Sequence, residues 1–132
     1  MNGPEIGGGH GKRTGRRVLS TEPLRVEASF EDSTKLLGLD GMNIGTYDAT
    51  PKPDGSLYGV GQGAFASFNG EIATWKAIGV GAFGPDGSVR YRGQISLTST
   101  GATLSKLNSA AVLYEFSIDA QGNTQSTFFE WK

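Results

Sequence analysis

Short turn motifs divide this chain into strand-like segments, and they constrain its fold more than any other feature. KPDG at 52–55 and GPDG at 84–87 place Pro second and Gly fourth, which is typical of a type I turn followed by a left-handed bulge residue. Asn69-Gly70 predicts a two-residue hairpin loop, and 120–123 resembles the bulged type. Tandem hairpins without a crossover helix indicate an antiparallel meander, either a closed barrel or a sandwich.

The segments between the turns alternate apolar and polar residues from about residue 18 onward. The expected strands are Arg25–Glu31, Asn43–Thr50, Ser56–Phe68, Glu71–Phe83, Ser88–Thr100, Ala110–Asp119 and Asn123–Trp131, with weaker candidates at Arg17–Ser20 and Lys35–Leu39. Only 103–108 is expected to form a helical turn. We therefore predict an all-β fold, a single antiparallel meander β-barrel of about seven or eight strands.

The composition excludes several classes of site. With no cysteine and a single histidine, His10, the chain has no disulfide, no thiol nucleophile and no histidine-centred triad. Clustered oxygen ligands are also missing from the sequence pattern, so we expect neither a metal nor a cofactor. No apolar run reaches membrane-spanning length and no secretory signal precedes the strands, so we expect no membrane partner and a cytoplasmic protein.

Charge is distributed unevenly along the chain. Residues 1–17 are rich in glycine and hold four basic residues against Glu5 alone, whereas the rest of the chain is acidic. This predicts a flexible basic arm over 1–17 attached to a barrel domain over 18–132. A basic arm could contact nucleic acid or an anionic surface, but an acidic body lacks the cationic face of a nucleic-acid groove. We therefore expect no nucleic-acid partner.

Turn chemistry predicts which side chains face the barrel interior, because a hairpin loop sets the strand register. A two-residue loop at Asn69-Gly70 pairs Tyr58 with Gly81, and a bulged turn at 84–87 pairs Trp75 with Leu97. In this register apolar residues and tyrosines gather on one face and most charges on the other. The lining predicted to contact a ligand comprises Tyr58, Gln62, Trp75, Tyr91 and Tyr114.

This interior suits a small, largely apolar ligand, because it combines apolar walls with a few polar groups. Asp48 and Glu130 are the only carboxylates that the register sends inward. They are candidate polar anchors and, in an alternative interpretation, the acid or base of an isomerase or cyclase, with a tyrosine as hydrogen-bond donor. A filled core with its polar ends in water is a further alternative, so enzymatic activity stays open.

A third interpretation is a non-catalytic interaction module. The same register turns outward Tyr47, Phe129, Trp131 and a ridge of Ile78 and Val80, and exposed aromatic and apolar residues favour cover by another subunit. We therefore expect a homo-oligomer, a dimer or trimer.

The segments 59–64 and 79–84 match the glycine spacing of dinucleotide-binding loops, but a hairpin turn and another strand follow each of them, where that site needs a helix.

Several segments carry a resemblance to other proteins. PDGSLYGVGQG at 53–63, GEIATWKAIGVG at 70–81, VRYRGQISLTST at 89–100, LSKLNSAAVLYEFSID at 104–119 and the terminal EWK look like a group of short uncharacterised prokaryotic and environmental proteins. More remotely, the glycine-rich antiparallel meander is similar to the allene oxide cyclase-like barrels. That second resemblance implies an axial ligand pocket and an oligomer, and it transfers no catalytic residue.

Overall fold

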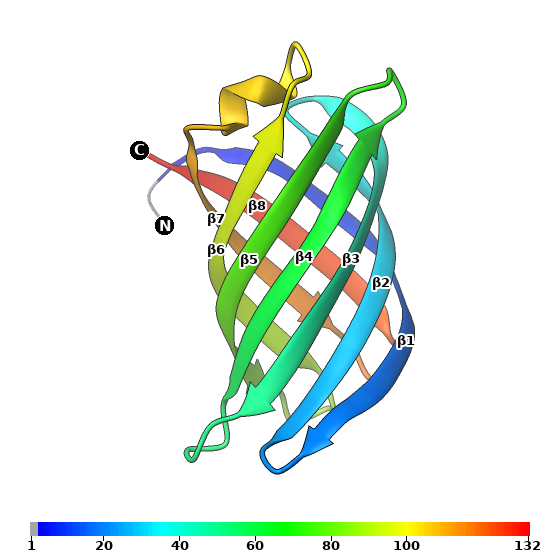
Figure 1. Ribbon diagram of the computed structural model, residues 1–132, viewed down its shortest axis with the longest axis vertical. Coiled ribbons are helices and arrows are strands. Elements are labelled where there is room, and N and C mark those ends of the chain that lie inside the picture. Colours follow the sequence, from blue (N-terminus) through cyan, green and yellow to red (C-terminus); the bar gives the residue numbers. More distant parts are fainter. Residues whose placement is uncertain (1–2) are drawn as a thin grey trace.

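The computed structural model describes residues 3–132 and is a closed barrel of eight antiparallel strands, each paired with its neighbours in chain order (Figure 1). The expected all-β meander barrel is therefore confirmed. The strands are β1 (Glu5–Thr21), β2 (Leu24–Leu36), β3 (Leu39–Pro51), β4 (Leu57–Ser67), β5 (Ile72–Phe83), β6 (Val89–Ser99), β7 (Ala111–Ile118) and β8 (Asn123–Trp131). One 3-10 turn, η1 (Leu104–Leu107), connects β6 to β7 and coincides with the expected helical turn at 103–108.

Four of the hairpins use the same turn, in which the fourth residue is a left-handed glycine. Gly55, Gly70, Gly87 and Gly122 have φ values of +87°, +95°, +84° and +85°. Glycine adopts this conformation without the steric cost that a Cβ would bring. The two Pro-Asp-Gly turns therefore form as predicted.

The hairpin between β4 and β5 differs from the expected two-residue loop. Ser67 N–H donates to Glu71 O at 2.8 Å, and Gly70 N–H donates to Ser67 O at 3.1 Å. The loop thus contains three residues, 68–70, and the register moves by one residue on the β4 side, so Gly81 pairs with Leu57 instead of Tyr58. The turn at 84–87 pairs Trp75 with Leu97 as expected, and the turns at 52–55 and 119–122 set the pairing of β3 with β4 and of β7 with β8.

This one-residue difference reverses the two faces of β4. Because strand side chains alternate between faces, Tyr58 and Gln62 point outward, and Gly59, Gly61 and Phe65 point into the barrel. β3 reverses with it, since its pairing with β4 is unchanged.

A second correction concerns the expected strand Lys35–Leu39. Leu37 and Gly38, with φ values of +48° and +82°, form a tight turn in which Leu36 pairs with Leu39. The expected strand is therefore the end of β2 and the start of β3. Apolar side chains on both sides of the turn hid it in the sequence.

The predicted flexible arm is wrong for residues 5–17, which belong to the longest strand. β1 closes the barrel by pairing with β2 along its length and with β8 over Glu5–Lys12. Glycine at positions 7, 9 and 11 removed the apolar alternation by which strands are recognised. These glycines face neighbouring backbone and side chains that a Cβ would clash with, so close approach and not flexibility explains them. Residues 1–2 of the expected arm lie outside the described residues.

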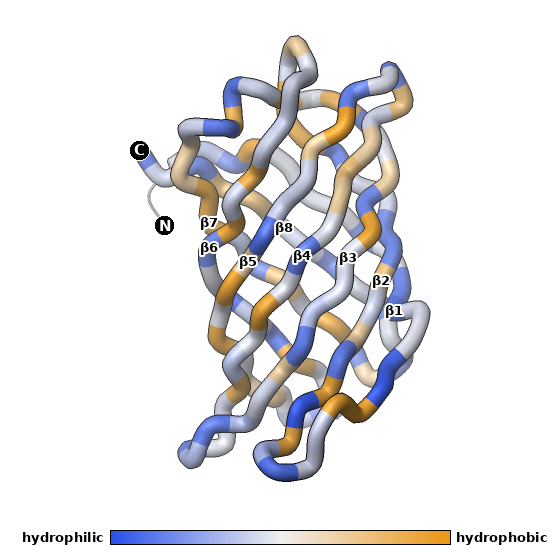
Figure 2. Tube along the Cα trace, viewed as in Figure 1, coloured by the Kyte–Doolittle hydropathy of each residue, from blue (hydrophilic) through white to orange (hydrophobic). Residues whose placement is uncertain are grey.

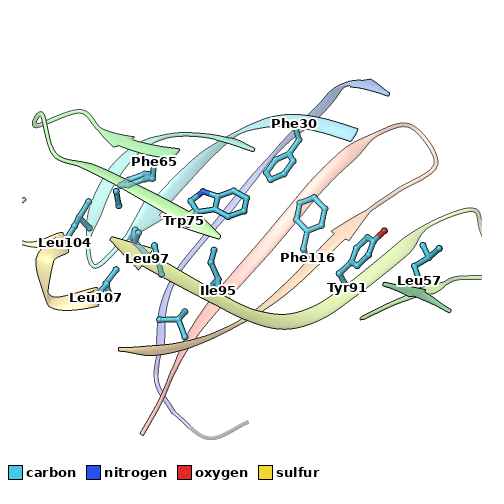
Figure 3. Close-up of a cluster of buried hydrophobic side chains, with 13 residues drawn as sticks. Phe30, Leu57, Phe65, Trp75, Tyr91, Ile95, Leu97, Leu104, Leu107 and Phe116 are labelled. Carbon is cyan, nitrogen blue, oxygen red and sulfur yellow. The ribbon is translucent and has the colours of Figure 1, made fainter. Parts of the chain in front are cut away.

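The apolar core extends along the barrel, and its side chains reach from one end to the other (Figure 3). η1 closes one end with Leu104 and Leu107, which pack beside Phe65 and Leu97. Leu57 lies toward the opposite end. Along the strands, hydrophobic positions alternate with hydrophilic ones, as a barrel with one buried face requires (Figure 2).

Candidate functional site

The interior contains a cavity of about 70 Å³. At roughly 10–15 Å³ for each water-sized occupant, this volume exceeds the space of one or two waters. Its lining comes from seven strands, β2 to β8, and is dominated by aromatic and aliphatic side chains with a few polar ones: Phe30, Asp32, Thr34, Leu36, Asn43, Tyr47, Gly59, Gly61, Phe65, Trp75, Ala77, Tyr91, Ile95, Leu97, Tyr114, Phe116, Ser126 and Phe128.

Three of the five predicted ligand-contacting residues line this cavity. Trp75 and Tyr91 are buried, and Tyr114 is half-buried beside them. Tyr58 and Gln62 lie on the outer surface, with Tyr58 45% exposed, because the β4–β5 loop is one residue longer than predicted.

Aromatic rings form a connected cluster in the middle of the cavity wall (Figure 3). The ring centroid of Phe30 lies 4.9 Å from that of Phe116 and 6.3 Å from that of Trp75. Tyr47 joins Phe30 to Tyr91, at 6.1 and 5.5 Å. Sequence reasoning missed Tyr47, because the expected register turned this face of β3 outward.

The phenols that line the cavity keep their protons at neutral pH. Burial raises the pKa of Tyr114 to about 12 and also raises the pKa of Tyr47 and Tyr91 above the usual value for tyrosine. Each phenol is therefore a neutral group that can donate one hydrogen bond to a molecule in the cavity.

Neither predicted carboxylate lines the cavity. Asp48 lies on the outer side of the barrel, where its Oδ2 accepts a hydrogen bond from Arg25 Nη2 at 2.6 Å. Glu130 pairs with Val112 near the end of β8 and is half-buried. Asp48 points outward because β3 presents the opposite face to the interior from the one expected. Glu130 does not line the cavity because it lies near the end of β8.

The carboxylate that does line the cavity is Asp32, which is 2% exposed. Its Oδ1 accepts a hydrogen bond from Thr34 Oγ1 at 2.7 Å. On the next strand Asn43, the cross-strand partner of Asp32, accepts a hydrogen bond from Trp75 Nε1 at 2.8 Å. Burial raises the pKa of Asp32, although the polar side chains of Thr34 and Asn43 beside it oppose that shift.

Sequence reasoning missed Asp32 because it lies in the polar run DST at 32–34, between the expected strands Arg25–Glu31 and Lys35–Leu39. Continued alternation was the available signal: Phe30, Asp32, Thr34 and Leu36 occupy one face of β2. That face would have been found by extending the apolar residues on either side of the polar run.

No group of three His, Asp or Glu side chains suited to a metal ion occurs among residues 3–132. In the same part of the chain, no helix has the length and hydropathy needed to cross a membrane.

Fold and cavity together define the class of this protein: a small closed antiparallel barrel with an aromatic interior pocket. Solved structures share the fold at low sequence identity. A protein of unknown function from Clostridium acetobutylicum ATCC 824 has a TM-score of 0.86 and 11% identity, over 100% of this chain and 97% of that one. A conserved protein of unknown function from Rhodopseudomonas palustris has a TM-score of 0.80 and 11% identity, over 96% and 94%.

A third similar structure is a beta-barrel-like protein from Acinetobacter baumannii AYE, with a TM-score of 0.82 and 9% identity, over 99% of this chain and 96% of that chain. No family model and no curated protein matches the sequence. At these identities the similarity shows the fold alone, that of small barrel proteins, two of which are described as of unknown function.

Proposed function

We propose that this protein binds a small, largely apolar molecule inside the barrel. The observation that carries the proposal is the interior cavity of about 70 Å³. Protein interiors are usually packed to high density by their own side chains, so a cavity bordered by eight aromatic residues favours a bound guest molecule over an empty core.

The wall chemistry supports the same proposal. Trp75 Nε1 already donates a hydrogen bond to Asn43. This bond holds the indole ring in place, and the apolar face of the ring borders the cavity. The phenols of Tyr91 and Tyr114 add neutral donors. Such a lining binds by apolar contact and orients the ligand with few polar groups.

The test is a titration monitored by NMR, with three small compounds of matched shape: n-butanol, n-butylammonium chloride and sodium butyrate. We expect at least one to shift the indole N–H signal of Trp75 in a saturable manner. Ala77→Leu adds bulk to the cavity wall and should abolish the shift, because the added side chain occupies the void.

Ser96→Leu is the matched control, since Ser96 is exposed on the outer face of the neighbouring strand. This variant should bind as the wild type does. If no compound produces a saturable shift, or if Ala77→Leu binds equally well, interior binding is refuted.

The isomerase or cyclase alternative is less favoured. Its two candidate carboxylates, Asp48 and Glu130, do not line the cavity, and Asp48 is occupied by Arg25. A reaction in the cavity would have to use Asp32 in their place.

Self-association is a second candidate function, favoured by an apolar patch on the outer face of β4 and β5. The pairs Tyr58–Val80 and Val60–Ile78 are adjacent across these strands, and all four side chains are exposed. Exposed apolar patches that are contiguous often mark protein interfaces. A second copy of this chain is the proposed partner.

Sedimentation velocity across micromolar to millimolar concentrations tests this second candidate. We expect a dimer or trimer. Val80→Lys should dissociate it, because the lysine charge would lose its hydration when buried in the interface. Thr74→Lys, exposed on β5 outside the four-residue patch, is the control. A monomer at every concentration would rule out self-association.

A further inference from the structure

Three oxygen atoms at one side of the interior have no hydrogen-bond partner among the described residues: Asp32 Oδ2, Thr124 Oγ1 and Ser126 Oγ. Their residues are 2%, 3% and 8% exposed. Buried polar atoms in folded proteins nearly always have a partner, because an unpaired one loses its hydration without compensation. Three orphan acceptors in one interior therefore point to a group from outside the chain.

The strand register brings these oxygens around the same part of β1. Asp32 on β2 pairs with Gly11 on β1, and Gly11 pairs with Thr124 on β8. In the adjacent row Gly9 lies between Thr34 and Ser126. The polar side chains of β2 and β8 thus face each other across a strip of β1 that carries no side chains.

The glycines of this strip cannot be replaced by larger residues without a clash. A Cβ on Gly11 would lie 2.5 Å from Asp32 Cβ, and a Cβ on Gly9 would lie 2.5 Å from Thr34 Oγ1. Asp32 and Thr34 therefore occupy the space that side chains at positions 11 and 9 would take. Asp32, Thr34 and Ser126 also line the cavity, so a ligand in the cavity can reach this polar strip.

Among the described residues, Asp32 has no cationic partner. The ion pairs of the described residues are Arg17–Glu27, Arg25–Asp48, Lys35–Asp40 and Arg90–Glu115, and none includes Asp32. The basic side chain that lowers the pKa of Asp32 is His10, which is exposed on β1. A buried carboxylate without a counter-ion is costly, and a bound cation would offset that cost.

Aromatic rings complete the surroundings of this carboxyl. Phe30 lies two residues from Asp32 on the same face of β2, and it contacts the rings of Trp75 and Phe116. The faces of aromatic rings attract organic cations, most strongly where water is excluded. An anionic group beside aromatic faces is an arrangement that selects cations over neutral molecules of equal shape.

We propose that the cavity binds a small organic cation, a primary ammonium on a short apolar body, with the ammonium group between Asp32 Oδ2, Thr124 Oγ1 and Ser126 Oγ. An ammonium has three N–H donors and no acceptor, which matches three unpartnered acceptors. A water or an alcohol has fewer donors and no charge. This inference rests on the proposed function and specifies its ligand class.

The three compounds named above also test this inference, because they share a four-carbon chain and differ in the charge of the polar end. We expect n-butylammonium to bind the wild type at least tenfold more tightly than n-butanol, and butyrate to bind most weakly. Asp32→Asn keeps the acceptor for Thr34 but removes the charge, so it should abolish the preference for the ammonium. Asp40→Asn, which removes an exposed carboxylate from β3, should retain it.

Ser126→Ala and Thr124→Val each remove one acceptor without changing the charge, so they keep the test valid if Asp32→Asn does not fold. Each should weaken n-butylammonium binding severalfold and leave n-butanol binding unchanged. Equal binding of the ammonium and the alcohol, or a preference that survives Asp32→Asn, would overturn the inference while interior binding stands. If none of the three compounds binds, both proposals fail.

Discussion

At the scale of single residues, glycine decides where the large interior rings can lie. A Cβ on Gly45 would lie 2.7 Å from Trp75 Cζ2, and a Cβ on Gly81 would lie 2.7 Å from Tyr91 Cε1. On the same strands the glycines themselves pair with large residues, as Gly81 does with Tyr91. The high glycine content of this chain therefore makes room for aromatic residues in a narrow barrel.

Gly63→Ala tests this role of glycine. A Cβ at Gly63 would clash with Ile44 O and the indole ring of Trp75, and the backbone oxygen cannot give way easily. We expect a loss of about 1–3 kcal/mol in the free energy of unfolding, as for other overpacked cores. Urea denaturation measures it.

Gly15→Ala is the matched control, because a Cβ there has nothing within 4 Å. That variant should stay within about 0.5 kcal/mol of the wild type. Equal losses in the two variants would mean that the clash with Ile44 O and Trp75 does not explain the glycine at position 63.

Asp32→Asn has a predicted effect on stability that depends on pH. Burial raises the pKa of Asp32 in the folded state above its unfolded value. Folding then favours the protonated form, so the contribution of Asp32 is fully present below the unfolded pKa and is lost as pH rises through the folded pKa. At pH 7 the asparagine variant should be more stable than the wild type by about 1–3 kcal/mol.

This gain should shrink as the pH falls toward the unfolded pKa of about 3.8. Urea denaturation of both proteins at several pH values measures it. A gain that grows on acidification would contradict the sign of the shift.

At the scale of elements, η1 depends on one carboxylate from a distant hairpin. Glu71 Oε1 accepts hydrogen bonds from the backbone N–H groups of Thr103 and Leu104, at 3.0 and 2.9 Å. These bonds, the one from Leu104 first, lower the pKa of Glu71. The contact fixes η1 over the barrel end, where Leu104 and Leu107 complete the core.

We expect Glu71→Ala to loosen η1, because two backbone donors lose their acceptor. Hydrogen exchange at the amides of Thr103 and Leu104 should accelerate at least tenfold, with little change in the centre of β5. Glu31→Ala, an exposed carboxylate on β2, is the control and should leave both amides protected.

The pH dependence of Glu71 has the opposite sign to that of Asp32. The pKa of Glu71 is lowered in the folded state. Its contribution to stability is therefore present above the unfolded pKa and is lost as the pH falls through the folded pKa. Protection of η1 that is independent of acidification would contradict this assignment.

Turn chemistry predicted most of the strand pairing, but the β4–β5 loop shows its limit. Asn69-Gly70 fits a two-residue loop and equally fits the end of a three-residue loop with Gly70 in the left-handed conformation. The choice of loop depends on which face of β4 packs better. With Gly59 and Gly61 inside, Trp75 and Tyr91 have room, whereas Tyr58 and Val60 would fill that space.

At the scale of the whole molecule, β1 closes the barrel because it pairs with β2 on one side and with the last strand, β8, on the other. A truncation that removes residues 1–17 would delete most of this strand. It would unpair β8 and expose Asp32, Thr124 and Ser126 to water. We expect the truncated chain to lose its cooperative thermal transition, which circular dichroism measures, because an open sheet leaves two unpaired edges.

Removal of residues 1–3 alone, which precede β1, is the control and should change the transition little. A truncated protein lacking residues 1–17 that melts cooperatively near the wild-type temperature would restore the interpretation of these residues as an accessory arm.

The amino-acid sequence by itself determined the all-β class, the order of the hairpins and the inward Trp75, Tyr91 and Tyr114, because turn residues and alternation act over a few neighbours. Tertiary structure alone decided that β1 belongs to the barrel, which face of β4 points inward and that Asp32 is buried. Each of these depends on contacts between residues far apart in the chain. Closing a barrel weighs all eight strands together, so the best packing of the whole can override the locally favoured turn.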